Sequence, residues 1–423
     1  MGPPTCFSSS KVRFVTQAAA RFGDRRPRSE RGLGRFAPLE SLTKTGNFRQ
    51  CCAVCRRPLT SSSPLTTVRG MSSATTRSKD ALAGFDPAGA AIHDGIFGLP
   101  HTPEQASVVI VPVPWEPTTS YRRGTAKAPA AILAASRQVD LYDLDTGKPY
   151  EAGIAMLPED PEIVKWNQEA CEAATPVIEA GGHVTGNPQL QEALLRVNEA
   201  SHRLNERVRR IVKSQLDRGK IVGLVGGDHS APFGALRALA ERYPHFGILH
   251  IDAHADLRDS YEGFTYSHAS IMRNAIVQIP AVQRIVQVGV RDLSEEEHAF
   301  IRGSHGRIAS FFDRDLAQRA FTGETFAHTA GAIAEALPEH VYVSFDIDGL
   351  DPSLCPHTGT PVPGGLSFRE AVALLAEVAN SGRRIIGFDL NEVAPGPDGD
   401  EWDANVGARM LYKLIGFALA ARP

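Results

Sequence analysis

Short apolar runs alternate with longer amphipathic stretches along the sequence from about residue 81 onward. The short runs are rich in β-branched residues and predict strands. Several are apolar almost throughout, which is typical of strands that are buried on both faces. The expected strands are residues 107–113, 221–225, 246–251, 284–289, 341–347 and 384–390.

The stretches between these runs have the periodicity of helices. The longest begins near Pro188, a residue suited to the first turn of a helix, and continues toward Gly219. Alternating strands and helices predict an α/β fold, in which helices cover both faces of a mainly parallel sheet. No repeat or linker is evident after residue 90, so one domain is expected over residues 81–423. The other expected helices are residues 231–243, 269–277, 329–337, 367–381 and 405–421.

Charge divides the chain into two unlike segments. Residues 1–79 contain 15 Lys and Arg but 3 Asp and Glu, whereas the other 344 residues contain 30 basic and 45 acidic side chains. The formal net charge of −3 is therefore a cancellation. A hydrophobic content of 42% and a charged content of 22% exclude a wholly disordered chain. No apolar run reaches the roughly 18 residues that a transmembrane helix needs.

The basic segment, residues 1–80, is rich in Arg, Ser, Thr and Pro and lacks steady hydrophobic periodicity. We expect it to be disordered, because such a composition buries too little apolar surface to offset the entropy of ordering. It is typical of an organellar transit peptide, mitochondrial rather than chloroplast. Two alternatives stay open: an arm that binds RNA or membrane, and a true start at Met71, which would leave the protein cytoplasmic. Aromatic residues do not interleave with the basic ones as they would in a platform for nucleic acid. We expect neither a nucleic-acid nor a membrane partner.

Polar clusters follow four of the expected strands, where ligands of open parallel sheets bind. Residues i, i+2 and i+4 of an extended chain share a face, so Asp252, His254 and Asp256 should converge. Asp346 and Asp348 share a face for the same reason. The four clusters are residues 226–230, 252–256, 346–352 and 389–392.

Clustered carboxylates at the end of an apolar sheet repel one another and lose solvation unless cations neutralise them. Carboxylates combined with imidazoles suit Mn, Zn, Ni or Fe better than Ca. Four aspartates and two histidines are more ligands than one ion needs, so two ions about 3.5–4 Å apart fit the count. A single Asp or His at a strand end is usually a cap or a loop residue, but three such clusters together indicate a metal site.

With these motifs the sequence resembles the ureohydrolase family, which comprises arginases, agmatinases, guanidinobutyrases and related guanidine hydrolases. The motifs are Gly-Gly-Asp-His-Ser at 226–230, Asp-Ala-His-Ala-Asp at 252–256 and Ser-Phe-Asp-Ile-Asp-Gly-Leu-Asp-Pro at 344–352. They occur in the family's order, and the resemblance covers roughly residues 100–420. It implies a three-layer α/β/α, arginase-like domain that forms a homotrimer or homohexamer. It also implies two divalent metal ions, typically Mn, with Ni in some guanidine-hydrolysing members.

The resemblance also implies a set of ligands for the two ions. Asp252 and Asp346 would bridge both, and Asp228 would orient a ligand rather than bind metal. The complete set would be His229, Asp252, Asp256 and Asp346 for the first ion, and Asp252, His254, Asp346 and Asp348 for the second.

Two further positions resemble catalytic residues of the family. His268 matches the histidine that shuttles protons, although a helix-capping histidine is the alternative. Glu392 matches the acid that accepts the planar donors of a guanidinium, with a strand-end salt bridge as the alternative. In the implied mechanism a metal-activated water attacks the guanidinium carbon. His268, with Asp348 relaying the proton, then protonates the leaving amine, and urea is released.

The substrate is less sharply indicated. Residues 112–121 and 257–268 are similar to the agmatinase-like branch and its guanidine-hydrolysing relatives, which makes arginine the least favoured substrate. Trp115 and Tyr121 would narrow the pocket and offer cation–π contact, or they pack the core. Agmatine, giving putrescine, or free guanidine, giving ammonia, is expected, with guanidinobutyrase or arginase activity as alternatives. A metal-dependent deacetylase and a catalytically inactive assembly or regulatory subunit are further alternatives, and the complete ligand set argues against both.

Overall fold

The computed structural model describes residues 76–421. Almost all of the basic segment 1–80, with its transit-peptide prediction, lies outside the described residues. None of the helices in the described range has the length and hydrophobicity of a membrane-spanning helix. The α-helices are α1 (Thr76–Ala81), α2 (Ala128–Ala135), α3 (Pro161–Glu179), α4 (Pro188–Asp217), α5 (Phe233–Ala240), α6 (Ile271–Gln278), α7 (Glu295–Gly303), α8 (Asp313–Phe321), α9 (Phe326–Ala336), α10 (Phe368–Asn380) and α11 (Trp402–Ala420). The strands are β1 (Val108–Pro112), β2 (Ile154–Met156), β3 (Ile221–Val225), β4 (Phe246–Ile251), β5 (Val282–Val288), β6 (Ile308–Phe311), β7 (His340–Asp346) and β8 (Arg384–Asn391).

One sheet contains all eight of these strands, in the order β2-β1-β3-β8-β7-β4-β5-β6. Every neighbouring pair is parallel. The carboxyl ends of the strands therefore lie along one edge of the sheet. The four strands that precede the polar clusters, β3, β8, β7 and β4, are neighbours in the middle of that edge.

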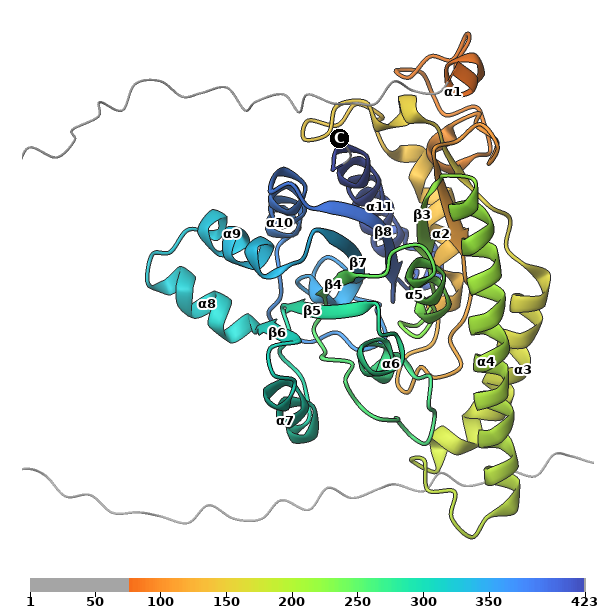
Figure 1. Cartoon of the computed structure of the whole chain (residues 1–423). Helices are drawn as coiled ribbons and strands as arrows, with labels where there is room; N and C mark the ends of the chain where they lie inside the picture. The colour runs from red at the N-terminus through yellow and green to blue at the C-terminus, as the bar shows by residue number, and fades with distance from the viewer. Residues whose placement is uncertain (1–75, 422–423) are drawn as a thin grey trace, which may run out of the picture. The chain divides into compact units, whose positions relative to one another are not determined.

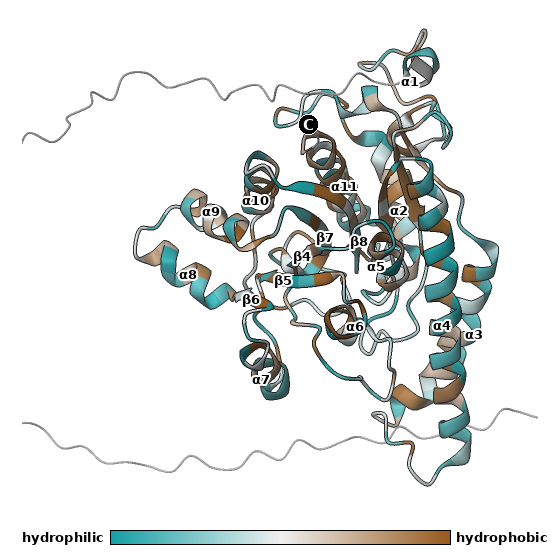
Figure 2. Cartoon of the chain, in the orientation of Figure 1, coloured by the Kyte–Doolittle hydropathy of each residue, from teal (hydrophilic) through white to brown (hydrophobic). Residues whose placement is uncertain are grey.

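Side chains of the strands alternate between two hydrophobic cores, one on each face of the sheet. Along β7, Val343 packs with α9, α10 and α11, whereas Tyr342 packs with α4, α5 and α6. Figure 1 shows these helices on opposite sides of the sheet, and Figure 2 shows hydrophobic colour on the strands and a largely hydrophilic α4. The prediction of a three-layer α/β/α fold with a parallel sheet is confirmed.

Local sequence explains where several helices begin. Ser294 and Glu297 form a capping box at the start of α7, and Ser367 and Glu370 form another at the start of α10. At α4 the side chain of Asn187 accepts a hydrogen bond from a backbone N–H of the first turn, and Pro188 follows at the first helical position.

All six expected strands are present, with ends that differ by at most two residues. The apolar pattern did not predict the two short strands at the edges of the sheet, β2 and β6, which have three and four residues. It also missed α1, α2, α3, α7 and α8, and residues 76–80 of α1 belong to the segment that was expected to be disordered. Short edge strands bury few residues, so they leave little hydrophobic pattern to detect.

Candidate metal centre and substrate pocket

The structure brings all six expected ligands together at or just beyond the ends of β3, β4 and β7. His229 follows β3, and its Nδ1 atom lies 3.0 Å from Oδ2 of Asp252. The same nitrogen lies 3.2 Å from Oδ2 of Asp256 and 3.1 Å from Oδ2 of Asp346. These four side chains form one half of the cluster and are almost completely buried.

The second half of the cluster lies around His254. Its Nδ1 atom is 3.0 Å from Oδ2 of Asp348 and 3.5 Å from Oδ1 of Asp252. Asp252 thus directs Oδ2 toward the first half and Oδ1 toward the second. A carboxylate that faces two ligand sets with different oxygens has the geometry of a bridge between two ions.

Burial and mutual repulsion work against charge in this cluster. Burial, and then the neighbouring Asp252 carboxylate, raise the pKa of Asp256 to about 7. Burial, and then Asp348, raise the pKa of Asp346 well above its ordinary value. The carboxylates therefore need added positive charge to ionise together, and a set of four carboxylates and two imidazoles fits divalent transition-metal ions.

Neighbouring side chains hold the ligands in place. Nε2 of His229 is 2.9 Å from Oγ of Ser344, which donates to Asp389 Oδ1 at 3.0 Å, so Nδ1 is the nitrogen that faces the carboxylates. The backbone at Asp256 and Glu392 has φ angles of 54° and 61°. This left-handed conformation costs most L-residues about 1–2 kcal/mol, less for Asp, and such strain gathers at functional sites.

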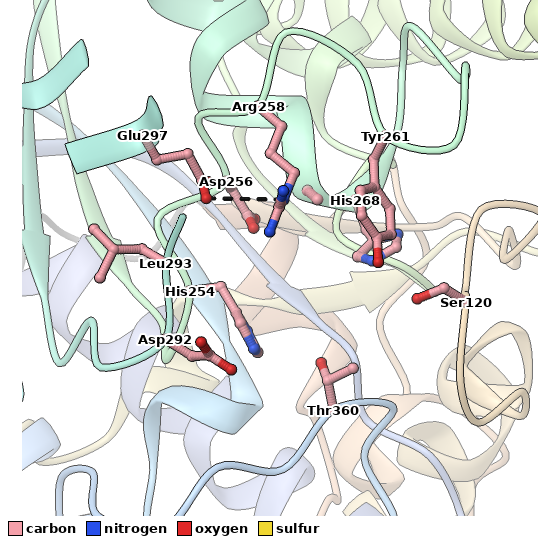
Figure 3. Close-up of a pocket in the computed structure, with 11 residues that line it drawn as sticks. Ser120, His254, Asp256, Arg258, Tyr261, His268, Asp292, Leu293, Glu297 and Thr360 are labelled. Carbon is pink, nitrogen blue, oxygen red and sulfur yellow. Dashed lines mark ion pairs between the residues drawn. The ribbon is translucent and has the colours of Figure 1, made fainter. Parts of the chain in front are cut away.

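His268 lines a pocket beside the cluster, and Figure 3 shows it across the cavity from His254. Its backbone N–H donates to Oγ1 of Thr118 at 3.1 Å. Its Nδ1 atom lies 3.3 Å from both Thr118 Oγ1 and Ser267 Oγ. Burial, and then the nearby His254 and His229, lower its pKa to about 4. The cap of the turn that follows is Ser267 rather than His268.

Glu392 lies at the end of β8 and is buried. Its Oε1 atom accepts from the backbone N–H of His229 at 2.9 Å, and its own N–H donates to Gly227 O at 2.8 Å. Within residues 76–421 it forms no salt bridge, unlike the alternative given for it. Burial, and then Asp228, raise its pKa well above the ordinary value. Its second oxygen lies beside Gly359, where an added Cβ would be 3.4 Å away.

Loops that follow the strands form the rim of the pocket (Figure 3). Nε of Arg258 lies 3.8 Å from Oε2 of Glu297, and its guanidinium lies 5.0 Å from the centre of the Tyr261 ring. Asn198 of α4 anchors this loop, because its side chain donates to Gly263 O at 3.3 Å and accepts from Thr265 N at 2.9 Å. The pocket is lined by Ser120, His254, Asp256, Arg258, Tyr261, His268, Ala269, Asp292, Leu293, Glu297 and Thr360.

The two aromatic residues expected at the substrate lie elsewhere. Trp115 is fully buried and packs in the core on the α4, α5 and α6 face, which is the alternative given for it. Tyr121 is 73% exposed and is not among the residues that line this pocket, although Ser120 beside it is. The substrate-binding prediction for Trp115 does not agree with its place in the core.

The sequence pattern missed two site residues: Thr118, whose partner is distant in sequence, and His250, which lies inside a strand. Thr118 Oγ1 donates to Asp228 Oδ2 at 2.8 Å, and Ser230 occupies the other oxygen of Asp228. Asp228 therefore joins the loop at residue 118 to the end of β3 and does not face the cluster. The other, His250, has Nε2 2.8 Å from Asp252 Oδ2. The alternation that grouped the ligands after β4 extends back to His250 and could have found it.

This fold, with a binuclear ligand cluster at the carboxyl edge of its sheet, is that of the metal-dependent hydrolases of guanidino compounds. The Arginase family model matches residues 106–416, and the chain belongs to this family. It is a hydrolase that acts on the C–N bonds of amidino groups.

Two relatives are matched by this chain over most of their own length. The chain is 33% identical over 324 residues to the N(1)-aminopropylagmatine ureohydrolase of Thermus thermophilus, covering 76% of this chain and 94% of the relative. It is 28% identical over 321 residues to the agmatinase of Bacillus subtilis, covering 74% and 93%. Among solved structures, the agmatine ureohydrolase of Thermoplasma volcanium superposes with a TM-score of 0.59 at 24% identity. It covers 81% of this chain and 98% of that one, which is a likeness of fold.

Proposed function

We propose that this protein hydrolyses agmatine to urea and putrescine, with two Mn²⁺ ions held by His229, Asp252, His254, Asp256, Asp346 and Asp348. The observation that supports the proposal best is the carboxylate of Asp252, which faces both halves of a complete ligand set. Relatives named agmatinase and N(1)-aminopropylagmatine ureohydrolase support the substrate class. Ni²⁺ is the alternative metal.

Two divalent ions held there would lower the pKa of a water molecule between them, so that a nucleophile forms near neutral pH. In this proposal, Glu392 holds the guanidinium with the oxygen that does not bond His229. The proton that the attacking water loses then passes by way of Asp348 and His268 to the leaving amine. Because Nδ1 of His268 lies beside two hydroxyl groups, its Nε2 is the atom left for this transfer.

The carboxylate of Asp292 favours agmatine over the second candidate substrate, free guanidine. It lines the pocket and forms no ion pair within the described residues. Agmatine carries an ammonium group at the end opposite its guanidinium, and Asp292 is placed to attract such a cation. Free guanidine has no second cation, so it would gain nothing from this carboxylate.

A substrate panel tests the proposal. The full chain would be loaded with Mn²⁺ or with Ni²⁺, and urea measured from agmatine, N(1)-aminopropylagmatine, guanidine, guanidinobutyrate and arginine. The expected result is the highest kcat/KM on agmatine with Mn²⁺. A preference for guanidine with Ni²⁺ would contradict both the proposed substrate, agmatine, and the proposed metal, Mn²⁺. The absence of urea from every compound would favour an inactive assembly or regulatory subunit.

We further propose that residues 81–423 are the catalytic domain of a homotrimer or homohexamer, and that residues 1–80 direct it to mitochondria. Light scattering after size exclusion measures the assembly. Fluorescent fusions of the full chain and of a chain starting at Met71 measure the targeting. A mitochondrial signal from both fusions would contradict the proposed role of the leader.

A further inference from the structure

A histidine that is neither an expected ligand nor a pocket residue lies directly beneath the cluster. His250 belongs to β4 and is completely buried. Its Nε2 atom lies 2.8 Å from Oδ2 of Asp252, the proposed bridge. Together with His229, Asp252 and Asp256 it offers ligand atoms close enough to hold an ion, so geometry must decide whether it binds metal or donates a hydrogen bond.

Gln287 of the neighbouring strand β5 determines which of these two roles His250 has. Its Oε1 atom accepts from Oγ of Ser310 on β6 at 2.8 Å. Its Nε2 atom donates to the carbonyl of Ala255 at 2.7 Å and faces Nδ1 of His250 at 3.1 Å. A flipped amide would point its oxygen at the Ala255 carbonyl, so the orientation of Gln287 is fixed.

The amide of Gln287 in turn fixes the tautomer of His250. Because Nδ1 faces an N–H donor, it must accept, and the ring proton therefore resides on Nε2. That proton points at Oδ2 of Asp252. His250 is thus a donor in this arrangement and has no free lone pair for a metal ion.

We propose that Ser310, Gln287 and His250 form a positioning relay that orients the carboxylate of Asp252 so that it can bridge two ions. His250 holds Oδ2, and the backbone N–H of His254 holds Oδ1 at 2.5 Å. Each oxygen keeps one further lone pair, one for each half of the cluster. This inference rests on the proposed binuclear function.

Other groups that face His250 do not take over this role. The ring of His229 lies 5.3 Å away between ring centres, and Oδ2 of Asp256 lies 4.0 Å from Nε2 of His250. Both are weaker partners than Asp252 at 2.8 Å. Without the relay, the carboxylate of Asp252 would lose the donor that fixes Oδ2.

The test compares Gln287→Leu with Gln283→Leu in the full chain. Gln283 is a matched control, because it lies on the same strand and bonds Nδ1 of another histidine, His245, but is exposed. Equilibrium dialysis against Mn²⁺ alone, with metal analysis, should show affinity about 10- to 100-fold weaker for Gln287→Leu and unchanged for Gln283→Leu. Unchanged affinity in a folded Gln287→Leu protein would overturn the relay.

Two further measurements keep the proposal testable if Gln287→Leu does not fold. Ser310→Ala removes only the outer donor and should weaken Mn²⁺ binding by a smaller factor, and no change would count against the relay. Nitrogen NMR of ¹⁵N-histidine-labelled protein should show a proton on Nε2 of His250 both without metal and with Zn²⁺. Loss of that proton on adding Zn²⁺ would make His250 a ligand instead.

The outcomes separate this inference from the proposed function. Wild-type protein that binds two Mn²⁺ ions but releases no urea would refute the function and leave the relay standing. Urea release by wild type, together with unchanged Mn²⁺ binding in both Gln287→Leu and Ser310→Ala, would refute the relay and leave the proposed function standing.

Discussion

The floor and the rim of the candidate site are built in different ways. The floor, the metal-ligand cluster, comes from residues at the ends of neighbouring parallel strands, where spacing along the chain sets spacing in space. The rim consists of loops held by contacts from far along the sequence, such as Thr118 with Asp228 and Asn198 of α4 with Gly263. We therefore expect the floor to determine the class of reaction and the rim to determine which guanidino compound reaches it.

The largest effect should come from the floor. Asp346→Asn removes a proposed bridging carboxylate, so urea production and metal loading should be lost together, measured by urea release and metal analysis. Asp351→Asn, in the same motif but outside the cluster, should keep both. An Asp346→Asn protein that retains metal and activity would contradict the assignment of the floor.

The next largest effect should come from the boundary between floor and rim. His268→Asn should lower kcat by about 10²- to 10⁴-fold, because a proton donor is lost, while both metal ions stay bound. The exposed His298→Asn serves as a control. If metal content falls along with kcat, then His268 is needed for metal binding. The loss of activity would then be explained without a role as proton donor.

The metal-free floor should be unstable at high pH. Burial, and then Asp252, raise the pKa of Asp256 to about 7, above its ordinary 3.8. Folding thus favours the protonated form, and stability falls as the pH rises from about 4 to above 7. In EDTA at pH 8, Asp256→Asn should raise the Tm by a few degrees, whereas with Mn²⁺ the wild type should be more stable.

The control for this stability measurement is Asp259→Asn, an exposed carboxylate of the same loop. It should leave the Tm unchanged under both conditions. The gain for Asp256→Asn in EDTA should also shrink toward pH 4. If metal-free Asp256→Asn protein is no more stable than wild type at pH 8, then burial and repulsion of the Asp256 carboxylate do not destabilise the metal-free protein.

A smaller effect is expected from the rim. Asp292→Asn removes the proposed partner of the distal ammonium and should raise KM for agmatine about three- to fivefold, as for an exposed ion pair. KM for guanidine should not change, and Glu295→Gln, a nearby acid outside the pocket, should affect neither. Equal increases in KM for both substrates would mean that Asp292 does not bind the distal ammonium group of agmatine.

The smallest effect should come from the anchor of the rim. Asn198→Ala removes two hydrogen bonds to the loop that precedes His268, so kcat/KM should fall about twofold with metal content unchanged. Steady-state kinetics with metal analysis measures both, and Glu199→Ala on the same helix is the control. A loss of metal in Asn198→Ala would erase the distinction between floor and rim.

This division also explains what the sequence could predict. The apolar runs located the central strands, because strands buried on both faces carry a continuous signal. The ligands followed from two-residue spacing at the strand ends. Trp115 stayed open between pocket and core, because a large aromatic residue beside a site motif looks the same in sequence whether it faces substrate or core. The contact between Thr118 and Asp228 spans 110 residues, which local pattern does not encode.

The order of the strands has a consequence for how the protein is made. Among the strands of residues 76–421, only the last one, β8, links β3 on one side to β7 on the other. Until it is synthesised, the partial sheet that positions His229 and the partial sheet that positions Asp252 have open edges and no shared strand. We therefore expect metal binding to follow the synthesis of nearly the whole chain, and a chain that stops before β8 to expose two unpaired edges to aggregation.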